Sequence, residues 1–112
     1  MFISVTKISL KNIFFIVRFM RHNAKIFKQI GEAKGNLSFA TSIQNPLVYW
    51  TFTTWDSKES MMQFRNNGAH KDAMKEVRNI TKEAISGHWE SEQKPSWKEA
   101  KVGMMENISS RY

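Results

Sequence analysis

The segment Leu47–Trp55, with the sequence Leu-Val-Tyr-Trp-Thr-Phe-Thr-Thr-Trp, constrains the fold more than any other part of the chain. Its residues are almost all β-branched or aromatic, which is the composition of a β-strand. Side chains alternate between the two faces of a strand, and here both faces carry bulky residues. The segment therefore predicts a central strand that is covered on both sides.

Hydrophobic alternation predicts three more strands, at Phe2–Leu10, Leu37–Ile43 and Ala84–Ser91. In the first, Ile3 and Val5 share one face while Ser4 and Thr6 share the other. In the last, His88 and Trp89 point to opposite faces. The turn Gln44–Pro46 joins two of these strands into a hairpin.

Apolar residues at steps of three and four predict a long helix over Asn12–Ala33. Its expected inward face consists of Ile13, Ile16, Val17, Met20, Ala24, Phe27 and Ile30, widened by Phe15, Phe19 and Ile26. Gly35 follows and suits a left-handed C-terminal cap.

Three further helices are expected later in the chain. The first begins at Asp56, which the spacing to Glu59 predicts as the N-cap, and it ends at Asn66–Gly68. A second runs from His70 to about Thr81, with Ala73, Met74, Val77 and Ile80 inward. A third follows Pro95, with Ser96 and Glu99 at capping spacing.

The predicted order is β-α-β-β-α-β with a C-terminal helix, which is the ferredoxin-like α+β arrangement. A single domain is expected over residues 1–112, with its core at about 2–92 and a helical tail at about 95–108. The arrangement leaves one sheet face open, whereas Leu47–Trp55 has two apolar faces. We therefore predict a homodimer formed sheet to sheet, a dimeric α+β barrel.

Composition and charge restrict the kinds of site and partner that the chain can have. The chain has no cysteine, and its three histidines do not stand at metal-ligand spacing, so no metal site is expected. Its net charge is +7, and Met1–Lys34 carries seven lysine and arginine residues against Glu32 alone. Such a basic segment is either a solvated helix face or a site for an anionic partner. No signal peptide or membrane span is expected, and the chain is predicted to be cytoplasmic.

The run Tyr49–Phe64 resembles the strand-to-helix segment of the antibiotic biosynthesis monooxygenase-like, dimeric α+β barrel superfamily. The steps Gly68–His70 and Pro95–Trp97 are similar to an uncharacterised bacterial subset of it, and to spheroidene monooxygenase-like proteins. The superfamily includes cofactor-independent quinone-forming monooxygenases, haem-degrading enzymes, isomerases and proteins without known activity. The resemblance therefore implies the fold more strongly than a reaction.

The haem-degrading branch usually carries a helical Trp at the position of Phe64 and an iron-ligating His at the position of Met74. Both are absent here, so the resemblance disfavours haem, and no cofactor is expected. His70, one helical turn earlier, is the alternative ligand. A helical Met such as Met74 is more often core filler than a ligand.

His70 is the candidate catalytic residue, because a helix N-terminus favours a neutral imidazole that can act as a general base. The candidate ligand-binding residues are Tyr49, Thr51, Thr53, Trp55, Phe64, Arg65 and Met74. If Tyr49, Thr51, Thr53 and Trp55 face the cavity, Trp50 and Phe52 pack against the helices; the opposite parity remains open.

The sequence favours a small-molecule-binding protein, with cofactor-independent monooxygenation of an aromatic or polyene-like substrate as the reaction. One alternative is a nucleic-acid-binding ferredoxin-like module that uses the basic first helix. That module stacks bases on an open sheet, but its usual aromatic motif is missing and a dimer would cover the sheet. The other alternative is a non-catalytic ligand-binding or stress protein.

Overall fold

The structure, a computed structural model, describes residues 1–111; Tyr112, the end of the predicted domain, lies outside the described residues. The elements are β1 (Phe2–Leu10), the 3₁₀ helix η1 (Ile13–Phe15), α1 (Ile16–Glu32), β2 (Asn36–Asn45), β3 (Val48–Trp55), α2 (Lys58–Arg65), α3 (Gly68–Ile80), β4 (Thr81–Glu90), α4 (Trp97–Glu106) and β5 (Ile108–Arg111).

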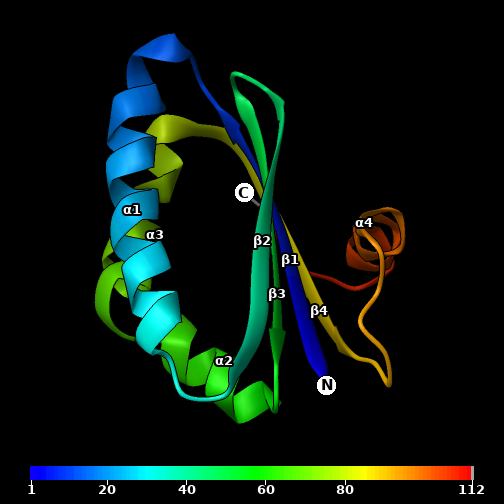
Figure 1. Ribbon diagram of the computed structural model, residues 1–112. Helices are drawn as coiled ribbons and strands as arrows, with labels where there is room; N and C mark the ends of the chain where they lie inside the picture. Colours follow the sequence, from blue (N-terminus) through cyan, green and yellow to red (C-terminus); the bar gives the residue numbers. More distant parts are fainter. Residues whose placement is uncertain (112) are drawn as a thin grey trace.

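The five strands form one antiparallel sheet in the order β2-β3-β1-β4-β5. Helices α1, α2 and α3 lie on one face of the sheet and α4 lies on the other (Figure 1). The first four strands have the predicted ferredoxin-like α+β arrangement. Strand β3 is an interior strand, paired with β2 on one side and β1 on the other, as predicted, and β5 adds an edge strand that alternation did not predict.

Strand β3 is covered on both faces, as its composition predicts, but not by the expected elements. Trp50 and Phe52 point away from α1–α3 and pack, with Ile3 and Val5, against α4. The ring of Trp97 meets that of Phe52 edge-on, at 5.5 Å between centroids. Helix α4 thus covers the sheet face that was expected to be open, and the homodimer remains a prediction. It also removes the open aromatic platform that the nucleic-acid alternative requires.

Two glycines explain how α4 comes so close to the sheet. A Cβ on Gly87 of β4 would lie 2.7 Å from the carbonyl oxygens of Met104 and Asn107. A Cβ on Gly103 of α4 would lie 2.5 Å from the ring of Trp89. At both contacts only a residue without a side chain lets backbone or ring approach.

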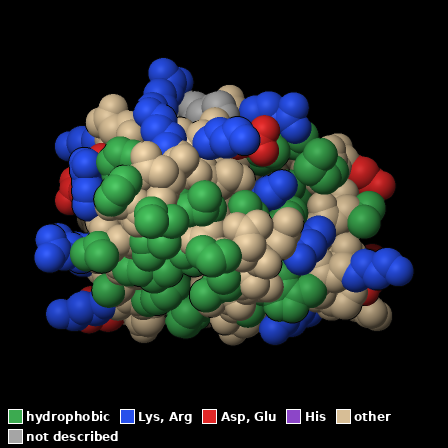
Figure 2. Space-filling view, turned by 90° about the horizontal axis from the view of Figure 1, so that it is seen from above, with side chains coloured by type: hydrophobic (Ala, Val, Ile, Leu, Met, Phe, Trp, Pro, Cys, Tyr) green, Lys and Arg blue, Asp and Glu red, His purple; other side chains and the backbone are tan. Residues whose placement is uncertain are grey.

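Helix α1 is turned relative to the predicted inward face. The sheet buries the strip around Phe19 and Ile30, so Ile13 and Val17 remain 63% and 62% exposed. Met20 and Ala24 are exposed as well. Of the two buried residues, Ile30 belongs to the predicted inward face, whereas Phe19 was expected only to widen it. Leu37, Phe39 and Ile43 of β2 are also exposed. Figure 2 shows a broad area of hydrophobic side chains with lysine and arginine around its edges.

Local capping is close to the prediction. Ser57, not Asp56, is the N-cap of α2, because its hydroxyl accepts a hydrogen bond from the backbone of Ser60. The predicted capping box of Ser96 and Glu99 is present at α4. None of the helices in residues 1–111 combines the length and hydropathy that a membrane-crossing helix needs.

Candidate functional site

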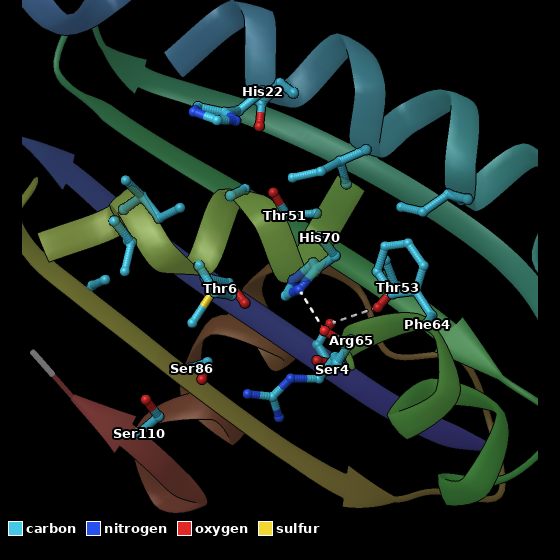
Figure 3. A pocket seen from close by; sticks show the side chains of 18 of the residues that line it. Ser4, Thr6, His22, Thr51, Thr53, Phe64, Arg65, His70, Ser86 and Ser110 are labelled. Carbon is cyan, nitrogen blue, oxygen red and sulfur yellow. Dashed lines mark hydrogen bonds between the residues drawn. The ribbon is translucent and has the colours of Figure 1, made fainter. Parts of the chain in front are cut away.

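A pocket of about 120 Å³ lies between the sheet and helices α1, α2 and α3 (Figure 3). An apolar cavity of about 150 Å³ is known to hold one benzene molecule. The enclosed part of this pocket is therefore of the size of a single aromatic ring. Its lining is mostly apolar, with a few polar groups, as small-molecule sites usually are.

The floor of the pocket is a set of hydroxyl groups on the sheet. Thr6 of β1 pairs in register with Thr51 on β3 and with Ser86 on β4, so these three hydroxyls form a row across the strands. Ser4 pairs in the same way with Thr53. All five residues line the pocket. A sheet face under helices is normally apolar, so this row of hydroxyls gives the pocket an unusually polar floor.

Aromatic rings form the wall next to the floor. Trp55 is fully buried, and its indole N–H donates to the hydroxyl of Thr53 at 2.9 Å. The ring of Phe64 lies 5.2 Å from that of Trp55 and 5.1 Å from the imidazole of His70, measured between centroids. Both aromatic rings are held by packing, so the wall is rigid.

His70 stands in the first turn of α3 and lines the pocket. Its Nδ1 lies 3.2 Å from the carbonyl oxygen of Arg65. A carbonyl can only accept, so this bond places the ring proton on Nδ1 and leaves the lone pair on Nε2. Burial, followed by the charge of Arg65, lowers the pKa of His70 to about 4. The imidazole is therefore neutral at neutral pH, the form a general base requires.

Gln29 of α1 fixes the segment that carries His70. Its amide nitrogen donates to the carbonyl oxygens of Phe64 and Asn67, at 3.0 and 2.8 Å. Its amide oxygen accepts from the backbone N–H of His70 at 2.8 Å. One side chain thus ties α1 to the junction of α2 and α3 and satisfies backbone groups that the helix ends leave unpaired. Sequence reasoning did not single out Gln29.

Arg65 and Met74 lie at the mouth of the pocket. A second, more open hollow is lined by Arg65, Asn66, His70, Lys71 and Met74. Three of these residues also line the inner pocket, so the two spaces meet at Arg65, His70 and Met74. A ligand larger than one ring can extend through this point into the outer hollow.

A second histidine, His22 of α1, also lines the pocket. Its Nε2 contacts the carboxylate of Glu76 on α3, and Arg18 contacts the same carboxylate. This cluster joins α1 and α3 over the far end of the pocket. The sequence pattern of α1 did not predict this cluster, because Glu76 belongs to another helix.

Most of the candidate residues meet in one place. The structure brings Thr51, Thr53, Trp55, Phe64, Arg65, His70 and Met74 into the pocket lining. Tyr49 shares their sheet face but does not line the pocket. It packs against Phe19, and its hydroxyl donates to the carbonyl of Pro46 at 2.6 Å, a structural contact. The floor residues Ser4 and Thr6 were predicted to share a face but not to form part of the site.

The sequence profile of the antibiotic biosynthesis monooxygenase family matches residues 19–76. The chain belongs to this family. The match spans α1, the hairpin of β2 and β3, α2 and most of α3, and so includes the greater part of the pocket wall. A search of curated protein sequences gave no match.

Solved structures of the same fold agree with the family assignment. A candidate antibiotic biosynthesis monooxygenase from Nitrosomonas europaea has a TM-score of 0.72 at 11% identity, covering 83% of this chain and 100% of that chain. SnoaB, a cofactor-independent oxygenase from Streptomyces nogalater, has a TM-score of 0.67 at 9% identity, covering 83% and 94%. A candidate family member from Deinococcus radiodurans has a TM-score of 0.69 at 18% identity, covering 86% and 97%. At these identities the likeness concerns the fold.

The pocket does not fit haem, which some related enzymes bind. Its enclosed volume of about 120 Å³ suits one ring, whereas haem is a macrocycle of four pyrrole rings. No step through haem is therefore derived for this family member.

Proposed function

We propose that the protein is a cofactor-independent monooxygenase that oxidises a phenolic aromatic ring held between the sheet and helices α1–α3. The observation that carries the proposal is the neutral imidazole of His70, with its proton fixed on Nδ1, inside an aromatic pocket. Membership of the monooxygenase family and the cofactor-independent oxygenase SnoaB among the structural neighbours support it.

In the proposed reaction Nε2 of His70 first removes the proton of the phenol hydroxyl. The phenolate is electron-rich, and its para carbon forms a C–O bond with molecular oxygen, which is the oxidant. The protonated His70 returns its proton to the distal oxygen, which gives a hydroperoxide on the ring.

The hydroperoxide then loses the hydrogen of the same ring carbon as a proton, and its O–O bond breaks. The carbon becomes a carbonyl, and the released hydroxide takes the proton to form water. Phenol and O₂ thus give a quinone and one water molecule. One oxygen atom of O₂ enters the product and the other leaves in water.

The chain's own residues supply positioning and a dry environment. Trp55 and Phe64 hold the ring and exclude water. The absence of water favours transfer of electron density from the phenolate to molecular oxygen. In this proposal the hydroxyls of Thr51 and Thr6, both in the pocket lining, hold oxygen substituents of the ring. Because the substrate is electron-rich, the site needs little beyond one base and a shaped pocket.

The test uses purified protein with 1-naphthol under ¹⁸O₂. We expect oxygen uptake equal to product formed, and 1,4-naphthoquinone that carries one ¹⁸O atom. His70→Ala should abolish turnover without loss of secondary structure by circular dichroism. The matched control is His88→Ala, since His88 lies on the same sheet face but outside the pocket lining.

Two results would reject the proposal. Turnover retained in His70→Ala would exclude the imidazole as the base. Binding of 1-naphthol without oxygen uptake, for this and other phenols, would favour the non-catalytic ligand-binding alternative instead.

A further inference from the structure

The charges around the pocket are one-sided. Among the described residues that line it, Arg65 is the one lysine or arginine, and none is an aspartate or glutamate. The outer hollow adds Lys71 and again no carboxylate. A ligand that crosses from the pocket into the hollow therefore meets two cations and no anion.

Among the described residues, 1–111, Arg65 has no acidic side chain paired with it. Within residues 1–111 the ion pairs involve the N-terminus, Arg18, His22 and Lys75, and none involves Arg65. Its side chain is partly buried at the rim of an apolar pocket, where water screens charge less than at the open surface. Figure 3 shows the side chain among Ser4, Ser86 and Ser110, over the hydroxyl floor.

From this arrangement we propose that the ligand of the pocket is an aromatic acid, whose ring lies against Trp55 and Phe64 and whose anionic group pairs with Arg65. The inference rests on the proposed function, because it concerns the same pocket and names the class of molecule that enters it. A guanidinium offers a fork of N–H donors that matches a carboxylate in two parallel bonds.

The neighbouring imidazole fits this assignment. Arg65 helps to lower the pKa of His70, so the two groups are close enough to interact electrostatically. A carboxylate bound to Arg65 would neutralise part of that charge. The bound acid would therefore make His70 a stronger base than it is in the free protein.

The experiment compares 2-naphthoate with its neutral isostere 2-naphthamide, and measures each dissociation constant by quenching of tryptophan fluorescence. Chemical shifts of His70 show that binding occurs in the pocket. We expect the acid to bind the wild-type protein at least about tenfold more tightly than the amide, as a charge-assisted bidentate contact implies. Arg65→Gln should remove this preference for the acid over the amide, and Arg65→Lys should keep part of it.

Arg21→Gln is the matched control, because Arg21 is an exposed arginine on α1 that does not line the pocket. If acid and amide bind wild-type protein equally and both shift His70, the aromatic acid is excluded while the pocket remains a site for neutral rings. If the preference for the acid survives in Arg65→Gln and falls in Arg21→Gln, the anion binds the basic surface of α1 and the inference is wrong. If neither compound shifts His70, the inference is wrong, and the oxygen-uptake test with 1-naphthol decides the proposed function separately.

Discussion

Nδ1 of His70 lies 3.2 Å from the carbonyl oxygen of Arg65, five residues earlier in the chain. The contact bridges the break between α2 and α3, so the imidazole is held by the backbone of one helix and carried by the next. It sets the tautomer of His70 and places the side chain of Arg65 at the same pocket mouth. A neutral imidazole and a cation are thereby positioned together by a single turn of chain.

The burial of His70 makes the protein less stable in acid. As pH falls below the ordinary pKa of about 6.5, the unfolded chain binds a proton at this residue, but the folded chain does not do so until pH approaches about 4. Stability is therefore full above pH 6.5 and is lost as pH falls towards 4, by roughly 2–3 kcal/mol. His70→Phe should reduce this loss, measured as the difference in urea-unfolding free energy between pH 7 and pH 4.5.

The pKa of His88 is lowered as well, by burial and then by the charges of Arg65 and Lys58, so it contributes in the same direction. His88→Asn is therefore the comparison variant, and it should leave most of the acid sensitivity in place. A pH profile that is identical in wild type and His70→Phe would show that His70 titrates normally in the folded protein.

Gln29 should be needed for the position of His70. Gln29→Leu removes the hydrogen bonds to the carbonyls of Phe64 and Asn67 and the one from the N–H of His70, and we expect a loss of about 1–3 kcal/mol of unfolding free energy. The Nδ1–H tautomer of His70, observed by ¹⁵N NMR of the ring, should also become mixed. Gln63→Leu is the control, since Gln63 is an exposed amide on α2. An unchanged tautomer in Gln29→Leu would reject a positioning role.

Gly35 and Gly31 should respond in opposite ways to the same substitution. Gly35 has a φ of +88°, and an added Cβ would lie 2.3 Å from Oγ of Ser60 and 2.5 Å from a carboxylate oxygen of Asp56. We expect Gly35→Ala to destabilise by about 1–3 kcal/mol. Gly31 is helical with open space at its Cβ, so Gly31→Ala should stabilise by up to about 1 kcal/mol. Thermal unfolding of the two variants measures both effects.

The homodimer can be tested by native mass spectrometry. We expect a dimer formed through the sheet face that α4 covers, where Val102 is 52% exposed on the outer side of the helix. Val102→Glu should then yield monomer, and Val17→Glu on α1 should remain dimeric. The reverse result would place the interface on the exposed apolar residues of α1 and β2. Monomeric wild-type protein would exclude the dimer.

The sequence by itself determined the order of the elements. Apart from η1 and β5, each strand and helix follows from a local pattern, as in Leu47–Trp55, and the ferredoxin-like topology follows from that order. The candidate residues Trp55, Phe64 and His70 could also be predicted from the sequence. They lie within one continuous segment, in which local patterns encode the strand, the turn and the starts of the helices.

Only the tertiary structure decided which apolar surface is buried where several compete. On α1 the strip with Phe19 and Ile30 is buried and the strip with Val17 is exposed, because the sheet and α3 contact the side of Phe19 and Ile30. It also brought α4 over Trp50 and Phe52, where Gly87 and Gly103 allow a close approach that no periodicity reveals. The contacts of Gln29 with His70 and of His22 with Glu76 join residues far apart in the chain. Such contacts depend on how helices pack, so one-dimensional patterns do not contain them.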